Sequence, residues 1–475
     1  MGLNFFREVI DRRVLPAAGV YVGASWVLVE MLDRLVERYF LSPFITDIVF
    51  WGLLSLLPAV LLLAWTHGRP GKDEVTRLEK YGIPIYVLAA GVTLVTAFGS
   101  KDLSATAELV TLPNELGVEE SHYIPRESYR RRIAVFFWDA EGLAPEQEWL
   151  RYGVTELLTQ DLQQNPFLLA TSPWNGWAGG FYNEMKEAGF DDGLDVPLAL
   201  KQDIADQFNR DYFIDGTIGR ADQQFTATAR VWDTETLEMI DEISASGWDL
   251  MTVVDDLSDG VRELLDTPQG QGDLPLAETY GESQDALQAY IQGRNAVLFE
   301  NDREKANQLY DLALQADKNF VLAWSVKAIS LWQQGDAAMA IEALEEAQKL
   351  SYRLPERDRV RLKMAAYQMS GDSEKLETLL RMQTRIVGDS ASYSALGFYL
   401  MTAGELEDAK AQFKKQMEVD SSSFGVLLQL ARLERATGDL DAACLLYTSP
   451  SPRDQLQQHV CRHLLENGRG GGGGG

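Results

Sequence analysis

The sequence predicts a multidomain protein with N-terminal transmembrane helices, an α+β sandwich domain and a C-terminal α-solenoid. Three observations support this architecture. Long runs without charged residues occupy the first hundred positions, strand-like and helix-like patterns alternate through residues 133–267, and one helix-turn-helix pattern recurs through residues 286–443. A chain of 475 residues, 46% of them hydrophobic, is long enough to form two or three separate cores.

A membrane anchor is expected over residues 1–100. The predicted transmembrane helices comprise residues 14–31, 48–66 and 81–100. The second and third runs have the length of about 20 apolar residues that a helix needs to cross the hydrocarbon core. The first uncharged run ends at Val29. It therefore spans the membrane only if Glu30 and Met31 lie at the far interface, and the sequence leaves this open.

Positive charges predict the orientation of the anchor. They precede the first run and lie in the loop between the second and third runs: Arg7, Arg12, Arg13, Arg69, Lys72, Arg77 and Lys80. Because cytoplasmic loops are rich in Lys and Arg, three spans with a cytoplasmic N-terminus place the rest of the chain outside the cytoplasm. If the first run only lies on the membrane, the soluble part becomes cytoplasmic, and one basic segment then faces the wrong side.

A polar linker is expected at residues 101–132, because this segment is rich in Glu and ends in a cluster of arginines. The α+β domain follows at residues 133–267. Its expected strands are 133–138, 167–172, 212–219, 225–232 and 238–244, and its expected helices are 145–162, 199–209 and 250–265. Strands and helices in this order predict helices packed on one sheet.

Two sequence segments of the α+β domain resemble a known module. IAVFFWDAEGLAPEQEWLRYGVTELLTQDL, which begins at Ile133, and DYFIDGTIGRADQQFTATARVWDTETLEMI, which begins at Asp211, look like the domain similar to the amino-terminal part of TolB. The anchor segment FFREVIDRRVLPAAGVYV also resembles the anchors of that group of bacterial envelope proteins. The resemblance implies a non-catalytic module in a bacterial envelope protein. With the orientation predicted above, the anchor lies in the bacterial inner membrane and the soluble domains lie in the periplasm. The resemblance brings no active-site residues.

A second linker is expected at residues 268–285, followed by the repeats at 286–443. The repeat turns recur about every 34 residues. They lie at Asn301-Asp302, Gly335-Asp336, Gly371-Asp372, Gly404-Glu405 and Gly438-Asp439. Gly or Asn suits such a turn because the backbone there adopts left-handed dihedral angles as a helix ends. An irregular helical bundle is the alternative, but it does not explain the period.

These repeats resemble the tetratricopeptide repeat. The second repeat matches at Trp324, Ala328, Leu331, Gly335, Ala340, Leu344 and Ala347, and the fourth at Tyr393, Leu396, Gly397, Leu400, Ala409 and Phe413. The third repeat departs from the pattern, with Val360, Met364 and Leu376 where the family has other residues, and the closing Pro is absent from all of them. The resemblance implies a tetratricopeptide-type array that binds a partner protein or peptide.

In that family the first helix of each repeat lines a concave groove. Counting back from each turn gives the candidate partner-binding residues Asn295, Trp332, Arg361, Phe398, Met401, Arg432 and Arg435, with Ile291, Leu298 and Ile329 beside them. Arginine and asparagine bind carboxylates and backbone amides, and large apolar residues supply anchors. We expect a partner that is acidic or ends in a free carboxylate. The alternative is that the apolar rings pack between repeats and the arginines pair with the acidic surface.

A second candidate site is an aromatic loop within residues 172–197. Its aromatic residues are Trp174, Trp177, Phe181 and Tyr182, set among glycines. Long loops in compact domains tend to be functional, although these rings would serve equally well to cap the core of their own domain.

Composition and motifs exclude several functions. The formal net charge of −28 argues against binding nucleic acid. The sequence contains no known catalytic, nucleotide-binding or metal-binding motif, so we expect no cofactor, no metal and no enzyme activity. Residues 444–475 resemble a translated sequencing adapter followed by a glycine run, and they include both cysteines. These residues are not expected to belong to the fold, and the array is expected to continue beyond its cut at Ala443.

The sequence therefore predicts an inner-membrane interaction scaffold of the bacterial envelope. One alternative is a ligand-sensing membrane component that signals through a partner chain. The other is an enzyme with an unrecognised carboxylate site, for which Asp139 and Glu141 are the only candidates, because they follow a strand end.

Overall fold

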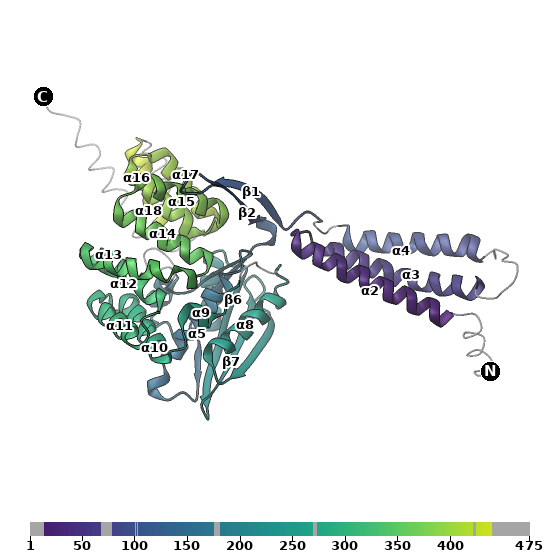
Figure 1. Ribbon diagram of the computed structural model, residues 1–475, viewed down its shortest axis with the longest axis horizontal. Coiled ribbons are helices and arrows are strands. Elements are labelled where there is room, and N and C mark those ends of the chain that lie inside the picture. Colours follow the sequence, from purple (N-terminus) through teal and green to yellow (C-terminus); the bar gives the residue numbers. More distant parts are fainter. Residues whose placement is uncertain are drawn as a thin grey trace. The chain divides into compact units, whose positions relative to one another are not determined.

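The computed structural model describes residues 14–67, 78–99, 101, 103–174, 181–268, 273–420 and 424–438 (Figure 1). The chain divides into two compact units, Met1–Glu108 and Leu109–Gly475, and each is described by itself. The C-terminal residues 444–475, Trp177 of the aromatic loop and the arginines before the first helix lie outside the described residues.

The first unit contains three long apolar helices. They are α2 (Val14–Arg38), α3 (Phe44–His67) and α4 (Ile83–Phe98), the last preceded by the short π-helix η1 (Leu78–Gly82). Their apolar stretches are 23, 24 and 19 residues long, so each is long enough to cross a membrane by length and composition. The first stretch runs through Glu30 to Val36, further than the sequence predicted.

The three helices pack as antiparallel neighbours. The Tyr21 hydroxyl of α2 donates a hydrogen bond to the Leu53 carbonyl of α3 (2.7 Å), and the Tyr86 hydroxyl of α4 donates to the Ser55 carbonyl of α3 (2.8 Å). After α4, the Thr106 amide donates to the carbonyl of Phe40 in the turn between α2 and α3 (2.6 Å). The chain therefore leaves α4 on the same side as the α2–α3 turn.

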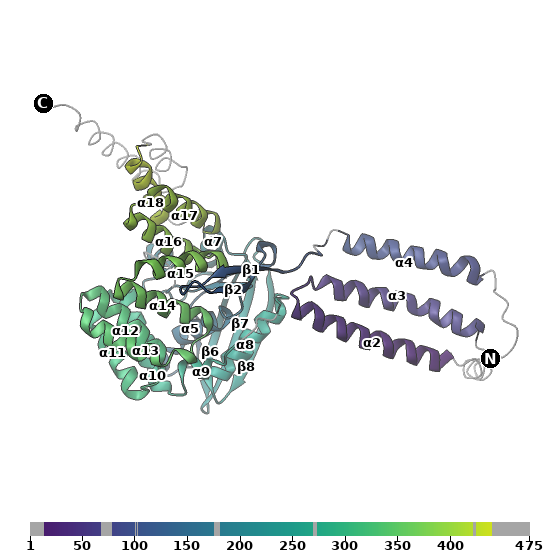
Figure 2. The same cartoon turned by 45° about the horizontal axis from the view of Figure 1, so that its top comes forward.

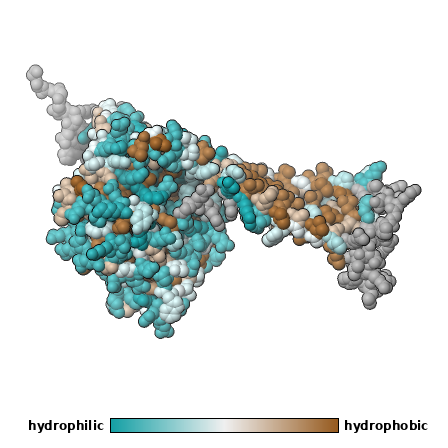
Figure 3. All heavy atoms as spheres, in the orientation of Figure 1, coloured by the Kyte–Doolittle hydropathy of each residue, from teal (hydrophilic) through white to brown (hydrophobic). Residues whose placement is uncertain are grey.

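The outer faces of these helices are apolar. Figure 3 shows a band of hydrophobic residues over them. Leu15, Val20, Trp26, Leu88 and Val95 are all more than half exposed. The surface of a soluble protein rarely exposes so much contiguous apolar area. An apolar surface of this kind suits contact with lipid.

A β-hairpin replaces the first expected linker. β1 (Ala107–Pro113) and β2 (Glu119–Pro125) are joined by a turn in which the Asn114 side chain accepts hydrogen bonds from the amides of Leu116 and Val118 (2.9 and 3.0 Å). β2 contacts α15 of the repeats, and Lys363 of α14 pairs with Glu115 (2.6 Å). These strands could not be predicted from the sequence, because both faces of the hairpin are largely exposed and no hydrophobic alternation marks them.

The predicted sheet domain is confirmed. Its strands are β3 (Arg131–Val135), β4 (Asp139–Glu141), β5 (Leu168–Thr171), β6 (Tyr212–Ala221), β7 (Gln224–Asp233) and β8 (Met239–Gly247). Their order is β5-β3-β6-β7-β8, and β4 extends the pairing of β3 with β6. β5, β3 and β6 are parallel, with Ile133 opposite both Ala170 and Tyr212, while β6, β7 and β8 form an antiparallel meander.

Helices cover both faces of this sheet. They are α5 (Leu150–Leu162), α6 (Tyr182–Glu187), α7 (Leu198–Gln207) and α8 (Leu250–Leu264), with the short 3-10 helices Glu127–Tyr129 and Pro145–Gln147. Ile133 and Val135 pack against α5 and α8, whereas Ala134 and Phe136 belong to the core beneath α6 and α7. Successive strand residues point to opposite faces, so the unbroken apolar run at 133–138 reflects a strand buried on both sides.

The C-terminal helices form the predicted repeat array (Figures 1 and 2). They are α9 (Leu276–Tyr280), α10 (Gln284–Asn295) with its π-helical continuation η5 (Ala296–Glu300), α11 (Arg303–Ala316), α12 (Val321–Gln334), α13 (Ala337–Lys349), the 3-10 helix Ser351–Arg353, α14 (Glu356–Ser370), α15 (Ser373–Ile386), α16 (Ser390–Ala403), α17 (Leu406–Val419) and α18 (Phe424–Ala436). In both views the helix pairs stack in chain order.

The turns of the array have the geometry that the sequence predicted. Asn301, Gly335, Gly371 and Gly404 all have positive φ, between 53° and 87°. The aspartates that follow the first three turns cap the next helix, because each side chain accepts the amide hydrogen bond of the residue three positions on.

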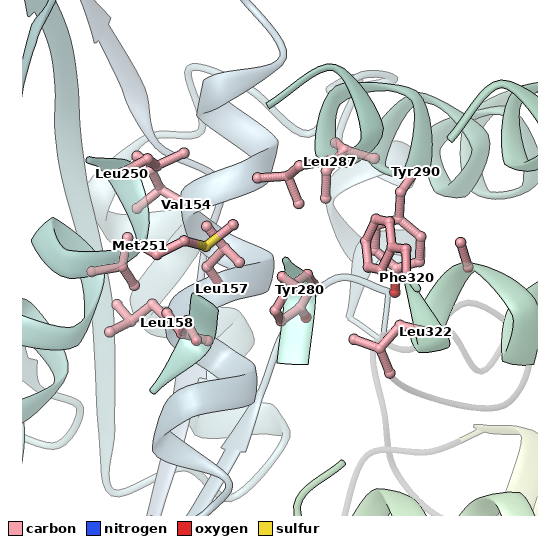
Figure 4. Close-up of a cluster of buried hydrophobic side chains, with 14 of the residues drawn as sticks. Val154, Leu157, Leu158, Leu250, Met251, Tyr280, Leu287, Tyr290, Phe320 and Leu322 are labelled. Atoms are coloured by element: carbon pink, nitrogen blue, oxygen red, sulfur yellow. The ribbon is translucent and has the colours of Figure 1, made fainter. Parts of the chain in front are cut away.

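One hydrophobic core joins the sheet domain to the first repeats. Figure 4 shows Val154 and Leu157 of α5 beside Tyr280, Tyr290 and Phe320 of the array. Tyr280 is fully buried although it lies in the second expected linker, so α9 belongs to the packed structure. The last repeats have a separate core around Leu400 and Phe413.

Candidate functional site

The structure places the predicted groove residues in two groups. The last repeats carry Phe398 and Met401 on α16, half-buried at the edge of the core around Phe413, with the Phe398 ring 5.2 Å from the Phe413 ring. Arg432 and Arg435 lie on α18 and are exposed. The two arginines occupy the repeat positions equivalent to those of Phe398 and Met401, so the apolar pair on α16 is partly exposed and the corresponding pair on α18 is basic and exposed.

The earlier repeats present a different surface. Trp332 of α12 is half-buried against the core, Ile291 is buried, and the Arg361 guanidinium lies 3.1 Å from the Asp358 carboxylate of the same helix. Asn295 is half-buried, and its side-chain oxygen has no hydrogen-bond partner in the described part of the chain. The assignment of these residues to a partner-binding groove stays a prediction.

The described aromatic residues of the candidate loop lie in two environments, the core of the sheet domain and its margin. Phe181 and Tyr182 are 2% exposed and pack beneath the sheet. Trp174 lies at the margin of that core, with its ring 4.9 Å from the Phe137 ring and the guanidinium carbon of Arg294 5.2 Å from its ring centroid. Trp174 therefore lies against the first repeat.

The first repeat docks on the sheet domain through an aromatic residue that the sequence did not single out. Phe299, in the π-helical end of the first repeat helix, lies 5.2 Å from Tyr182, 5.5 Å from Tyr152 and 6.1 Å from Phe137, measured between ring centroids. Aromatic pairs at these distances add to the stability supplied by burial. The end of this helix is thus fixed beside the residues that follow β3.

A buried carboxylate fixes the same junction. Glu156 of α5 is 1% exposed and accepts hydrogen bonds from the hydroxyls of Tyr290 (3.2 Å) and Tyr280 (3.4 Å) and from the Arg294 guanidinium. Burial raises the pKa of Tyr280 and of Tyr290, and the nearby Glu156 carboxylate raises both pKa values further. Burial alone would lower the pKa of Arg294, but the Glu156 carboxylate together with the hydroxyls of Tyr290 and Tyr310 outweighs burial and raises this pKa.

A pocket of about 230 Å³ opens at this junction, between Trp174 and the first two repeats. Its apolar walls include Leu298, Val326 and Ile329, and its polar lining includes Arg294, Arg303, Ser330 and Gln333. The structure therefore brings Leu298 and Ile329 of the predicted groove together with Trp174 of the predicted loop. Sequence reasoning missed Arg303 and Ser330, because neither stands at a repeat position that the family pattern marks as binding.

Two polar groups of this pocket lack partners among the described residues. Ser330 is 6% exposed, and its hydroxyl is buried. The Trp174 indole nitrogen is also buried. The Arg303 guanidinium donates to the neutral side-chain oxygens of Gln333 (3.1 Å) and Asn301 (3.3 Å). Arg294, by contrast, has its charge balanced by Glu156.

A second hollow of about 480 Å³ lies among α11, α12 and α13, around Trp324. None of its lining residues has a buried polar side-chain atom without a partner among the described residues. The Trp324 indole donates to the Lys318 carbonyl (3.0 Å), and the Lys349 ammonium pairs with Glu346 (2.5 Å). This hollow offers a ligand fewer unsatisfied groups than the pocket at Trp174.

The far end of the sheet domain holds the last repeats. The buried Arg130 donates to the carbonyls of Ile386 (3.0 Å) and Val387 at the end of α15. The Asn209 amide lies 3.4 Å from the Glu418 carbonyl at the end of α17, and Arg210 forms a buried ion pair with Asp420 (3.5 Å). Cations and donors suit these positions because helix C-termini carry unpaired carbonyls and partial negative charge.

The carboxylates of the sheet domain form ion pairs. Asp139 lies 3.8 Å from Arg151 and 3.7 Å from Arg230, and Glu141 is exposed. The buried Asp215 binds Lys201 (2.7 Å). Burial would raise the pKa of Asp215, but Lys201 together with hydrogen bonds from Trp232 and Arg230 outweighs burial and lowers that pKa. Within the described ranges, no group of three or more His, Cys, Asp or Glu residues is arranged to hold a metal ion.

Comparison with known proteins gives limited similarity. No protein-family model and no curated protein matches the sequence. Similar solved structures include MamA residues 41 to the end from Desulfovibrio magneticus RS-1 (15% identity, 40% of this chain and 99% of that chain, TM-score 0.27). They also include YrrB, a TPR protein with an unusual peptide-binding site (18% identity, 38% of this chain and 92% of that chain, TM-score 0.26). Yeast Tom70 is a third (11% identity, 96% of this chain and 89% of that chain, TM-score 0.30). At these scores the likeness carries no argument about function, so the repeat array rests on the helix pairs and turns of this chain.

Proposed function

We propose that this protein is an interaction scaffold of the bacterial cell envelope, anchored in the inner membrane by α2, α3 and α4, with its soluble part in the periplasm. The observation that carries the proposal is the surface of the last repeats. There Arg432 and Arg435 are exposed, one repeat after the half-buried Phe398 and Met401 at equivalent positions. Such a surface binds a partner without needing catalytic groups.

The chemistry of this surface defines the partner. Arginine binds a carboxylate through two parallel hydrogen bonds, and large apolar residues contribute most of the binding free energy once they are desolvated. The partner segment is therefore acidic or ends in a free carboxylate, and it carries one or two large apolar side chains.

The anchor supports the location. All three helices are long enough to span a membrane, and the chain leaves α4 on the side of the α2–α3 turn. If the basic segments before α2 and between α3 and α4 are cytoplasmic, the soluble part lies in the periplasm.

The test is capture of an envelope partner by the full chain in detergent. Replacing both Arg432 and Arg435 by Ala is expected to weaken capture by about 1 to 3 kcal/mol, the value of lost charged hydrogen bonds. The control replaces Arg359 and Arg385, which are exposed but lie at other repeat positions, and it is expected to capture normally. Equal capture by both double variants, with unchanged thermal unfolding, contradicts the groove.

A further inference from the structure

We infer that the pocket between Trp174 and the first two repeats binds one large apolar side chain of a partner peptide, and that Arg303 binds a carboxylate next to that side chain. This inference rests on the proposed scaffold function. It adds that the sheet domain, and not only the repeats, takes part in recognising the partner.

The size of the pocket indicates a side chain. Its volume of about 230 Å³ lies below the roughly 300–1,000 Å³ of typical small-molecule sites. Its walls combine the Trp174 ring with Leu298, Val326 and Ile329. Ile329 is 43% exposed at this surface, so an apolar side chain that enters the pocket covers it. An aromatic side chain fits best because it also packs edge-to-face on Trp174.

The unpaired polar groups indicate a peptide. A buried hydroxyl or indole nitrogen without a partner costs about 1–3 kcal/mol, so such groups are normally satisfied. Ser330 lines the pocket and is more than nine-tenths buried, with its hydroxyl unpartnered among the described residues. The Trp174 indole nitrogen is also buried and without a partner among the described residues, although Trp174 as a whole is only partly buried. A peptide backbone supplies partners for both groups. Its carbonyl accepts a hydrogen bond from the Trp174 indole, and its amide or carbonyl forms a hydrogen bond with the Ser330 hydroxyl.

The charge of the pocket indicates an acidic neighbour. Among the described residues, the bonds recorded for the Arg303 side chain go to neutral amide oxygens, so its charge is not balanced by a carboxylate. The charge of Arg294 is already balanced by Glu156. A carboxylate on the partner therefore gains a charge-assisted hydrogen bond from Arg303.

The probe is a fluorescein-labelled heptapeptide of glycine and serine with a central phenylalanine followed by glutamate. Its binding to the full chain in detergent is measured by fluorescence anisotropy. Two matched peptides replace the phenylalanine by alanine or the glutamate by glutamine. The phenylalanine–glutamate peptide is expected to bind at least about tenfold more tightly than either, from one apolar anchor and one charged hydrogen bond.

Two matched variants test the place of binding. Ile329→Glu puts a charge at the pocket, whereas Ile341→Glu puts one on α13 at a residue of nearly equal exposure, 43% against 42%. We expect Ile329→Glu to abolish peptide binding and Ile341→Glu to retain it. Arg303→Ala is expected to reduce affinity for the glutamate peptide by about tenfold and to leave the glutamine peptide unchanged. Thermal unfolding of each variant shows that it is folded.

The outcomes separate this inference from the scaffold itself. Equal binding of the phenylalanine and alanine peptides, or equal effects of the two Ile→Glu variants, overturns the pocket. If envelope capture then still depends on Arg432 and Arg435, the scaffold stands and only the pocket falls. If the probe binds at the pocket but the full chain captures no envelope partner, the pocket stands and the scaffold function falls.

Discussion

At the scale of single residues, the structure places several carboxylates where burial opposes their charge. Asp161 and Asp255 lie near one another between α5, α8 and the segment before α9. Burial raises the pKa of Asp161 to about 6, although Arg262 opposes the shift. Burial, followed by the charge of Asp161, raises the pKa of Asp255 to about 7. Both groups therefore bind a proton more tightly in the folded protein than in the unfolded chain.

This pair gives a pH dependence of known sign. Because the folded pKa of Asp255 is above its usual value of about 4, its contribution to stability is complete below about pH 4 and is lost as pH rises through about 7. Asp255→Asn keeps an acceptor for the Leu276 amide but removes the charge. We expect the variant to melt above the wild type at pH 8 and close to it at pH 4.5.

The neighbouring Asp256 supplies the control, because it lies on the same helix and is exposed. Asp256→Asn is expected to shift the melting temperature by the same small amount at both pH values. A difference between Asp255→Asn and wild type that does not change with pH means that Asp255 is ionised in the folded protein throughout this range.

At the scale of elements, regular patterns were predictable and junctions were not. The strand at 133–138, the helix at 145–162 and the glycine turns at 335 and 404 follow from periodicity and backbone preference. The structure has the turns there, but strand β3 ends at Val135, and helix α5 begins at Leu150 after a 3-10 helix at Pro145–Gln147. The hairpin β1–β2 and the docking of α9 were missed. Apolar and polar residues alternate only weakly in these segments, and the residues that they contact lie far away in the sequence.

The junction at Glu156 shows why such contacts escape sequence reading. A lone Glu in an amphipathic helix reads as a surface residue, yet here it is buried beneath residues more than a hundred positions further along the chain. The same reasoning applies to Arg303 and Ser330, which form a pocket only because the first repeat docks on the sheet domain.

We expect Glu156→Gln to loosen the first repeat. The change leaves the partly buried Arg294 without its counter-charge, and breaking one side of a buried ion pair costs up to about 3–5 kcal/mol. Amide hydrogen exchange in α10 is therefore expected to accelerate, while exchange in α16, which belongs to a separate core, changes little.

The matched control is Glu148→Gln. Glu148 pairs with Arg151 at 3.6 Å, but its side chain is 48% exposed, so its loss is expected to cost less than about 1 kcal/mol. If both variants accelerate exchange in α10 equally, or if Glu156→Gln accelerates all helices alike, the carboxylate is not a local anchor of the first repeat.

At the scale of the whole molecule, the sequence was enough to order the parts, since each has its own period. The anchor was predicted from uncharged runs of about the length that crosses a membrane. Mixed strand and helix patterns predicted the sheet domain, and a period of about 34 residues predicted the array. What it did not show is that the sheet domain and the array share one core from Ile133 to Leu362. Such packing depends on side chains that meet only after both parts have folded.

The orientation of the chain across the membrane is the remaining whole-molecule prediction. A reporter enzyme that is active only outside the cytoplasm is expected to be active when fused after Ser100 and inactive when fused at Gly71. The reason is that the loop containing Gly71 carries Arg69, Lys72 and Arg77, whereas Lys101 is the only basic residue that closely follows α4. Three helices of sufficient length then place the two fusion points on opposite sides of the membrane. Activity at Gly71 with none at Ser100 reverses this orientation and moves the repeats into the cytoplasm. Equal activity at both points means that α4 does not span the membrane.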